Sequence, residues 1–228
     1  MQQAGTLIQR LWRAIRKEGL GGAVRKLHRR LLEYFYDIQN KTDTSGRTTL
    51  EHLTIKQGSL KDSVHYNPAQ VSHLRKLFTI MGPHLPASPS LVDFGCGKGR
   101  VLLVASEFEF LQIKGIELTT ELSEIARRNC EIYKSRHKTN ANFEVIEHDA
   151  TTYKILPTEN VFFMFNPFHA PIVQKVMENL EKSLAHHPRK ILIAYLHPLC
   201  ADVIDKHNHF QRILQMRLWE LDFILYGN

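Results

Sequence analysis

The sequence predicts an α/β protein with an open, mostly parallel sheet of seven strands that ends in an antiparallel hairpin. Three observations lead to this prediction. From residue 91 onwards, short apolar runs alternate with longer stretches of helical periodicity. The first of these runs breaks into a glycine-rich turn that opens a helix, at residues 91–100. The chain ends in two strand-like runs around a short turn.

The elements follow one another along the chain. A helix at 71–81 leads to a proline cluster at 83–89, and the alternation of strands and helices begins after it. Such alternation forms right-handed βαβ units, whose parallel sheet is covered on both faces. We expect strands near 91–94, 113–117, 143–147, 161–165 and 190–195, helices near 100–108, 120–134, 170–185 and 199–206, and hairpin strands at 210–216 and 221–226.

The N-terminal part differs in pattern from the rest. Residues 1–63 are expected to form a helical extension with a linker, and residues 64–228 the α/β domain. Apolar residues recur at helical spacing from Leu7 to Ile15, and a second amphipathic helix is expected at 24–38. The segment 41–63 is polar and rich in turn residues, which indicates a linker or a lid.

The net charge of +7 is concentrated in this N-terminal part. Residues 1–33 contain eight Lys and Arg against two Glu, so they account for +6 of it. Basic amphipathic helices either pack on a core with their basic face in solvent or bind a membrane surface or an acidic partner. Both interpretations stay open for residues 1–38. The nearly neutral remainder argues against a nucleic-acid partner, because a core that tracks a phosphate backbone should itself be basic.

The cysteines indicate a reducing compartment. Cys96, Cys130 and Cys200 are scattered and odd in number, without disulfide or metal-ligand spacing. No apolar run approaches the roughly 20 residues that span a bilayer. We therefore expect a cytoplasmic protein without a bound metal, and one that is peripheral at a membrane if residues 1–38 bind such a surface. His207 and His209 lack further ligands at metal spacing.

Acidic residues stand at the ends of the first two predicted strands. Asp93 precedes the glycine-rich turn, and Glu117 ends the run that begins at Gly115. A glycine turn at the switch point of a parallel sheet forms a nucleoside-binding crevice. Glu117 is placed to accept hydrogen bonds from two ribose hydroxyls, each worth roughly 1.5–3 kcal/mol. The alternative is that these carboxylates cap helices or pair with Lys98 or Arg100.

The glycine spacing distinguishes between two cofactors. A dinucleotide site wants G-x-G-x-x-G, with the pyrophosphate on the helix N-terminus. Here the glycines fall at 95, 97 and 99, position 100 is Arg, and Asp93 stands beside the turn. A carboxylate suits the sulfonium and ammonium of S-adenosyl-L-methionine (SAM) better than the phosphates of NAD. The sequence therefore favours SAM over NAD, and a methyltransferase over an oxidoreductase.

Four segments, in this order, resemble motifs I to IV of class I SAM-dependent methyltransferases. They are VDFGCGKGR at 92–100, GIEL at 115–118, HDA at 148–150 and FNPF at 165–168. The resemblance runs from about Tyr66 to the C-terminus and implies the Rossmann-like sandwich of that family. The D-T-S-G segment at 43–46 and the Y-x-P segment at 66–68 resemble a bacterial group of methyltransferase-like proteins whose substrate is undefined.

The resemblance implies a cofactor site at the strand ends. In that site Asp149 accepts from the adenine amine, and the backbone N–H of Ala150 donates to an adenine ring nitrogen. A turn or helix-cap role for Asp149 is the alternative. The residues that the resemblance assigns to the cofactor are Asp93, Gly95, Cys96, Gly97, Gly99, Glu117, Leu118, Asp149, Ala150 and Asn166.

The loop after the fourth strand resembles the N-P-P-[FYW] loop of methyltransferases that act on nitrogen. There the Asn oxygen and a proline carbonyl accept from the target nitrogen, and an aromatic ring stacks on a planar substrate. This chain has Asn166, Pro167 and then Phe168 where a second proline would stand. That departure weakens the parallel, and an ordinary Asn-Pro turn is the alternative.

Tyr66 resembles the Y-x-P tyrosine of lysine methyltransferases, where this element precedes motif I and covers the methionine end of the cofactor. A surface turn at 66–68 is the alternative. The resemblance thus assigns Tyr66, Asn166, Pro167 and Phe168 to the catalytic centre. It implies transfer of a methyl group to a protein amine or a small molecule. Methylation of an RNA or DNA base and non-catalytic SAM binding remain alternatives. A general base, if one is used, would be sought among His169, Tyr195 and His197.

Overall fold

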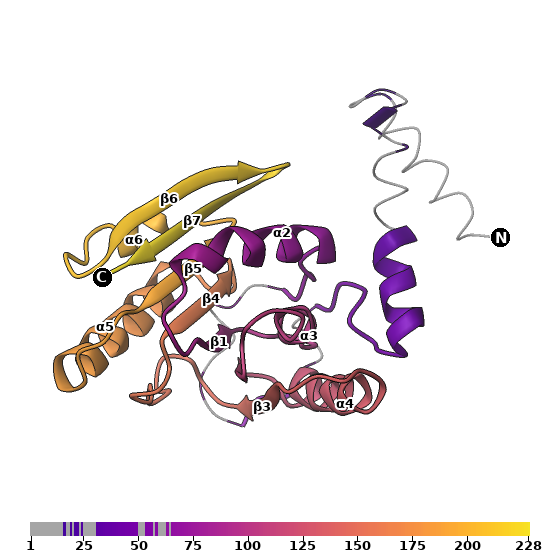
Figure 1. The fold of residues 1–228 in the computed structure, drawn as a ribbon, viewed down its shortest axis with the longest axis horizontal. Helices are drawn as coiled ribbons and strands as arrows, with labels where there is room; N and C mark the ends of the chain where they lie inside the picture. The colour runs from indigo at the N-terminus through magenta and orange to yellow at the C-terminus, as the bar shows by residue number, and fades with distance from the viewer. Residues whose placement is uncertain are drawn as a thin grey trace. The chain divides into compact units, whose positions relative to one another are not determined.

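The computed structural model describes residues 31–49, 53–56 and 65–228, together with the single residues 16, 19, 21, 22, 24, 58 and 63. It divides into two compact units, Met1–Lys41 and Thr42–Asn228. The larger unit contains one seven-stranded sheet in the order β3-β2-β1-β4-β5-β7-β6 (Figure 1). Strands β1 to β5 are parallel, whereas β7 runs antiparallel to both β5 and β6. This is the predicted mixed sheet with its C-terminal hairpin.

The observed elements match the expected ones in number and order from residue 71 onwards. The strands are β1 Ser90–Phe94, β2 Gln112–Glu117, β3 Asn142–Glu147, β4 Val161–Phe165, β5 Leu192–Leu196, β6 Gln211–Leu218 and β7 Leu221–Gly227. The helices are α2 Val71–Met81, the 3₁₀ turn η2 Gly82–His84, α3 Arg100–Ala105, α4 Thr120–Arg136, α5 Ala170–His186 and α6 Ala201–Ile204.

Two of the predicted helices are shorter than expected. The helix predicted at 100–108 ends at Ala105, where the Ser106 hydroxyl donates to the Leu103 carbonyl and a turn follows. The helix predicted at 199–206 is reduced to a single turn, α6. In both cases the flanking residues form hydrogen-bonded turns, which apolar periodicity does not distinguish from helix ends.

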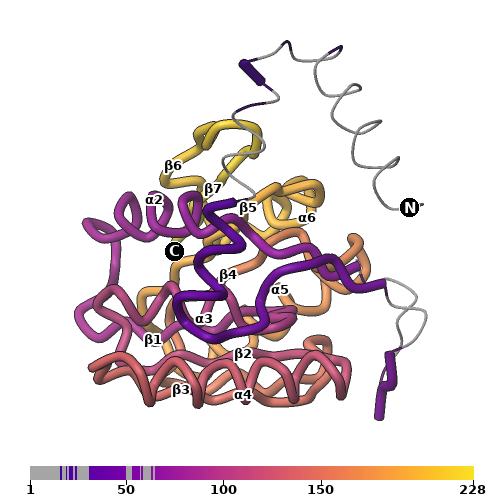
Figure 2. Tube along the Cα trace, turned by 90° about the vertical axis from the view of Figure 1, so that its right-hand side faces the viewer, coloured from indigo at the N-terminus to yellow at the C-terminus, as the bar shows by residue number. Residues whose placement is uncertain are grey.

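Helices cover both faces of the sheet, as alternating βα units require. Because side chains alternate along a strand, Val92 and Phe94 of β1 face α5 and α6. On the opposite face, Phe163 of β4 contacts Phe78 of α2. Figure 1 shows α2, α3 and α4 on that second side, and Figure 2 shows α4 alongside β3 at the sheet edge.

The chain order of the strands reverses at β1. Strand β1 lies between β2, which follows it in sequence, and β4, which is reached by a longer crossover. The loops after β1 and β4 therefore diverge to opposite sides and leave a crevice at the carboxyl ends of the strands. The strand-end acids and the glycine turn that the sequence analysis singles out lie at these carboxyl ends.

The smaller unit contains a helix over residues 31–40. Its exposed side chains include Leu31, Tyr34, Phe35 and Ile38, which fall on one helical face. The helix predicted from Leu7 to Ile15 lies outside the described residues. The membrane or acidic partner expected for residues 1–38 stays a prediction. Within the described part of the chain, no helix has both the length and the apolar character needed to cross a bilayer.

Candidate functional site

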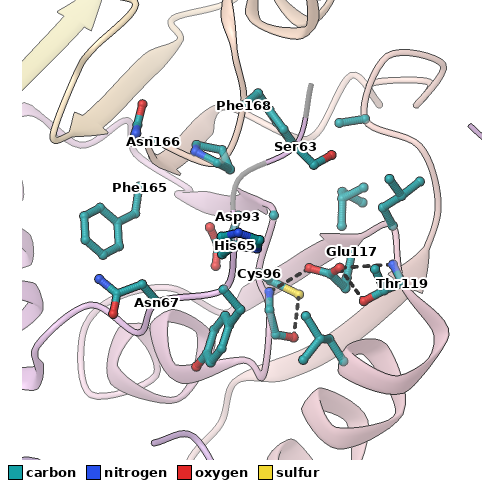
Figure 3. Close-up of a pocket in the computed structure, with 18 of the residues that line it drawn as sticks. Ser63, His65, Asn67, Asp93, Cys96, Glu117, Thr119, Phe165, Asn166 and Phe168 are labelled. Carbon is teal, nitrogen blue, oxygen red and sulfur yellow. Dashed lines mark hydrogen bonds between the residues drawn. The ribbon is translucent and has the colours of Figure 1, made fainter. Parts of the chain in front are cut away.

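A cavity of about 610 Å³ opens at the carboxyl ends of β1, β2, β4 and β5, at the switch point of the sheet. Its size is in the range typical of small-molecule sites. Segments before the first strand, which contain Arg47 and residues 65–69, complete its wall. Figure 3 shows Phe165 and Asn166 on one side of this cavity and Glu117 and Thr119 on the other.

The glycine turn lies directly against the cavity. Gly95 and Gly97 have positive φ angles of 76° and 53°, which glycine adopts without steric cost. A β-carbon on Gly95 would lie 2.6 Å from Cβ of Pro167, and one on Gly97 would overlap the ring of Tyr66. The bare backbone at these two positions is therefore required by the neighbours that pack on it.

Gly99 has a different place from the one that the resemblance implies. It is absent from the cavity wall. It precedes α3 with a φ of 84°, and a β-carbon there would lie 3.2 Å from Cβ of Ala126 in α4. Gly99 thus allows close packing of α3 on α4, and it does not reach the cavity.

Glu117 is 7 % exposed, and its carboxylate is fixed by three hydrogen bonds. One oxygen accepts from the Gly97 N–H at 2.9 Å. The other accepts from the N–H and the hydroxyl of Thr119, at 3.0 and 2.8 Å. Burial raises the pKa of Glu117, and these donors work against that rise. Each oxygen keeps lone-pair capacity, so the oriented carboxylate is able to accept from further hydroxyls.

Asp93 is 2 % exposed and carries a buried oxygen, Oδ2, without a hydrogen-bond partner among the described residues. Burial raises its pKa well above the usual range, and the charge of Glu117 raises it further. A buried carboxyl oxygen without a donor costs free energy unless a ligand supplies one. The cavity that Asp93 lines is therefore suited to a ligand with a cationic or N–H group.

The alternative that these two acids pair with neighbouring basic residues is not observed. Lys98 instead donates to Asp43, and Arg100 donates to Thr44 and Ser45. Both basic side chains turn away from the cavity acids towards the D-T-S-G segment. The carboxyl groups at the strand ends are left for other partners.

Cys96 lines the cavity between these acids, as a buried thiol. Burial and the nearby charges of Glu117 and Asp93 raise its pKa well above normal. It therefore stays protonated at neutral pH, which removes the thiolate needed for nucleophilic chemistry. Its Sγ instead packs close to Gly115, where a β-carbon would lie 2.6 Å away.

Asp149 has the turn role that the sequence analysis gave as its alternative, and it also lines the cavity. Its Oδ1 accepts from the N–H and hydroxyl of Thr151, at 2.8 and 2.7 Å. The second oxygen, Oδ2, faces Gly58, where a β-carbon would overlap it. Leu118 and Ala150 line the same part of the wall. The motif II and motif III residues thus meet at one end of the cavity.

Asn166, Pro167 and Phe168 line the wall beside β4. Asn166 has a φ of 40°, a left-handed conformation that Asn tolerates better than most residues. Phe168 is buried and packs into the apolar core beneath α5. The Phe168 ring is therefore held by the core and also borders the cavity. Asn166 and Pro167 are half-buried at the edge of the cavity.

The three candidate general bases occupy different environments. His197 lines the cavity and has a positive φ of 53°. His169 is exposed at the start of α5. Tyr195 is fully buried, and burial raises its pKa, which makes it a poor base. Of these three, His197 has the position that proton transfer would require.

His207 and His209 both lie against one carboxylate. Their Nδ1 atoms are 3.0 and 3.1 Å from Glu181 Oε1. Within the part of the chain that the structure describes, no cluster of three His, Cys, Asp or Glu side chains is arranged to hold a metal ion. His207 is buried and His209 is exposed, and neither belongs to the cavity wall.

Several cavity residues have no signal in the sequence analysis. Arg47, His65 and Asn67 come from segments before the sheet, and Thr119 and Thr151 follow strand-end acids. The two threonines are the partners of Glu117 and Asp149, and their position two residues after an acid could have indicated such turns. The first three are brought to the cavity by long-range contacts only.

No protein-family model matches the sequence, and neither does any curated protein. Solved structures do resemble it. A protein of Escherichia coli assigned to the methyltransferases has a TM-score of 0.56 at 16 % identity, over 80 % of this chain and 98 % of its own.

Two further structures are similar. An RNA methyltransferase from Salinibacter ruber, in complex with S-adenosyl-L-homocysteine, has a TM-score of 0.51 at 14 % identity, over 71 % of this chain and 93 % of its own. The ribosomal protein L11 methylase of Lactobacillus delbrueckii subsp. bulgaricus has a TM-score of 0.50 at 14 % identity, over 71 % and 79 %. The chain therefore has the fold of class I methyltransferases.

Proposed function

We propose that the protein is a SAM-dependent methyltransferase. The observation that carries this proposal is the pair of buried acids at adjacent strand ends. Glu117 is held in place as a hydroxyl acceptor, while Asp93 retains an unpartnered oxygen. SAM has a ribose with two hydroxyls and an amino-acid end with an ammonium group, so it satisfies both. The fold neighbours support this, since one of them is in complex with S-adenosyl-L-homocysteine.

Each part of the cavity wall has a function in this proposal. Glu117 accepts from the ribose hydroxyls, and Asp93 accepts from the cationic end. Asp149, Ala150 and Leu118 line the cavity, and we assign Asp149 Oδ2 and the Ala150 N–H to the adenine. When bound, the cofactor supplies an activated methyl group on a sulfonium. The chain needs to supply only position, orientation and exclusion of water.

The residues around β4 are proposed to receive the acceptor. The side-chain oxygen of Asn166 is able to accept a hydrogen bond from the attacking group and so orient it. Pro167 and Tyr66 pack over Gly95 and Gly97 and so limit water at the glycine turn. Of the three candidate bases, His197 is the one that lines this wall, and we propose its imidazole as the proton acceptor.

We propose a protein amine or a small molecule as the methyl acceptor. The charge distribution supports this over a nucleic acid, because residues 1–33 carry +6 of the net +7 and leave the rest nearly neutral. The neighbours include a ribosomal protein methylase and an RNA methyltransferase, so the fold does not choose between acceptors.

Calorimetry and methyl transfer test the proposal together. We expect the native protein to bind S-adenosyl-L-homocysteine at micromolar concentration and not to bind NAD. With SAM labelled in the methyl group, a lysate incubated with the protein should yield a labelled species, which mass spectrometry then identifies. Binding of NAD without S-adenosyl-L-homocysteine would contradict the cofactor assignment.

Asn166 variants separate transfer from binding. Asn166→Gly keeps the left-handed backbone and removes the amide, so it is the preferred variant, with Asn166→Ala beside it. We expect labelling to fall at least tenfold in both, as one lost oriented hydrogen bond allows. Affinity for S-adenosyl-L-homocysteine should stay within about twofold. Equal labelling by both variants and the native protein would remove Asn166 from the site.

A further inference from the structure

A short segment before the sheet is fastened to the glycine turn. We call residues 43–48 the strap. Lys98 Nζ donates to Asp43 Oδ1 at 3.0 Å and to the Ser45 carbonyl at 3.1 Å. Arg100, which is 3 % exposed, donates from Nε to Thr44 Oγ1 at 2.8 Å and from Nη2 to Ser45 Oγ at 2.9 Å. Both donors belong to the predicted motif I.

Two further residues hold the strap from other directions. Asn129 of α4 donates to the carbonyls of Asp43 and Lys98, both at 2.9 Å, and accepts from the Asp43 N–H at 2.8 Å. The Tyr66 hydroxyl donates to the Thr44 carbonyl at 2.7 Å, and the Thr48 N–H donates to the Tyr66 carbonyl at 3.2 Å. The backbone is thus fixed on both sides of position 47.

Arg47 is the strap residue that reaches the cavity. It is exposed and lines the cavity wall, and no described residue forms an ion pair or hydrogen bond with its guanidinium. Of the described wall residues, the two arginines are Arg47 and Arg100, and Arg100 is engaged with the strap itself. Arg47 is therefore the guanidinium in this wall that is free to meet a ligand.

The position of Arg47 relates it to the glycine turn. Its neighbour Thr48 pairs with Tyr66, and the Tyr66 ring lies over Gly97. Position 47 is thus tied to the segment that covers the glycine turn, and Arg47 shares the cavity wall with Gly97 and Asp93. Three acids, Asp93, Glu117 and Asp149, already line this cavity, so an anionic group bound beside them requires a cation.

We infer that Arg47 binds the carboxylate of the cofactor's amino-acid end. This inference rests on the proposed function. In this arrangement Asp93 and Arg47 recognise the two opposite charges of one zwitterion, the ammonium and the carboxylate. A guanidinium matches a carboxylate with two parallel hydrogen bonds, a geometry that lysine does not provide. The contacts of the strap fix the backbone from which the guanidinium extends before the ligand arrives.

Ligands that differ only in the amino-acid end test this inference. S-adenosyl-L-homocysteine carries both charges. 5′-Deoxy-5′-(3-aminopropylthio)adenosine keeps the ammonium and lacks the carboxylate, and 5′-methylthioadenosine lacks both. We expect Arg47→Met to lower the affinity for S-adenosyl-L-homocysteine at least tenfold in calorimetry. The affinities for the other two ligands should stay within twofold of the native values. Arg47→Lys should recover part of the loss. Arg75→Met, which removes an exposed arginine paired with Glu107, is the matched control and should change none of the three.

The outcomes separate this inference from the proposed function. If Arg47→Met lowers the affinity for all three ligands equally, Arg47 only supports the cavity wall. If its affinity for S-adenosyl-L-homocysteine is unchanged, Arg47 does not bind the carboxylate of this ligand. Either result overturns the inference and leaves the proposed function standing. Failure of the native protein to bind any of the three nucleosides would overturn the proposed function, and the inference with it.

Discussion

The ring of Tyr66 lies over the α-carbon of Gly97, so closely that a β-carbon on Gly97 would overlap two of the ring carbons. The contact joins the Y-x-P segment to the glycine turn, two segments about 30 positions apart in the chain. The tyrosine is fixed from its other end by the hydrogen bond from its hydroxyl to Thr44. The glycine turn and the Y-x-P segment therefore pack together as one unit of the cavity wall.

Substitution of Gly97 should disrupt that unit. Gly97→Ala introduces a clash with Tyr66 as well as a strained positive φ, which alone costs about 1–2 kcal/mol. We expect S-adenosyl-L-homocysteine binding to be lost or weakened at least a hundredfold in calorimetry. Gly19→Ala is the control, because Gly19 also has a positive φ, of 71°, but has open space around its α-carbon and lies outside the strap. Similar binding by the two variants would show that the contact with Tyr66 is unimportant.

Removal of the Glu117 carboxylate should weaken every nucleoside ligand. Glu117→Ala removes both the proposed ribose acceptor and the acceptor for the Gly97 and Thr119 amides. We expect at least tenfold weaker binding of S-adenosyl-L-homocysteine, or about 1.4 kcal/mol. Thr119→Val is the control, since it removes one donor to Glu117 and leaves the carboxylate in place. An affinity equal to that of the native protein in Glu117→Ala would end the ribose assignment.

Ligand binding should depend on pH through Asp93. Burial and the charge of Glu117 raise the Asp93 pKa, so the free protein holds a proton there over a wider pH range than an exposed acid does. A cationic ligand favours the ionised form. Affinity for S-adenosyl-L-homocysteine should therefore rise with pH up to that raised pKa and then level off. Calorimetry in buffers of different ionisation enthalpy should detect the released proton.

Asp93→Asn separates binding from stability. The variant should lose the part of the pH dependence due to Asp93 and retain the part due to Glu117, whose pKa burial also raises. Rising pH has the opposite effect on the stability of the ligand-free protein. Because the folded pKa of Asp93 is raised, its ionisation destabilises the ligand-free protein as the pH passes from the unfolded to the folded value. We expect Asp93→Asn to melt higher than the native protein at neutral pH. A lower melting temperature there would contradict the assigned environment.

A buried ion pair between Lys114 of β2 and Glu159, two residues before β4, should matter for stability alone. Glu159, 2 % exposed, accepts from Lys114 Nζ and from the Tyr153 hydroxyl, both at 2.6 Å. Lys114→Met leaves that buried carboxylate without its cation and should lower the free energy of unfolding by about 3 kcal/mol in urea. Lys175→Met breaks the exposed pair with Glu178 and should change it by less than about 1 kcal/mol. Neither variant should alter ligand affinity, and a large loss of affinity in Lys114→Met would place the pair in the site.

The sequence predicted the sheet well because its strands carry strong local signals. The five apolar residues of Val161–Phe165 coincide with β4, and the amphipathic run before the proline cluster coincides with α2. The shortening of α3 at Ala105 could not be predicted in this way. The residues that follow it include Phe108 and Phe110, which continue an apolar pattern but pack against Phe78 from a turn and a loop.

The site was predictable where it lies at strand ends and unpredictable where it depends on long-range contacts. Asp93, Glu117 and Asn166 each directly follow or close an apolar run, so their convergence follows from a parallel sheet. Arg47 has no such relationship to a strand. Its position depends on Lys98, Arg100 and Asn129, whose bonds to the strap have no periodic signature in the sequence. The same contacts direct Lys98 and Arg100 away from the cavity acids. Because the sequence does not show these contacts, pairing of the two basic residues with the acids was a reasonable alternative.

The strap also bears on the order of events during folding. Its partners Lys98, Arg100 and Asn129 stand 53 to 86 positions further along the chain, so closing these contacts requires ordering a long intervening loop. We expect the sheet to assemble first and the strap to dock afterwards. Amide hydrogens at 43–48 should then exchange faster with solvent than those of β1 and β4. Binding of a nucleoside that contacts Arg47 should slow this exchange. The amides of the strap should then respond to the ligand more strongly than those of the strands.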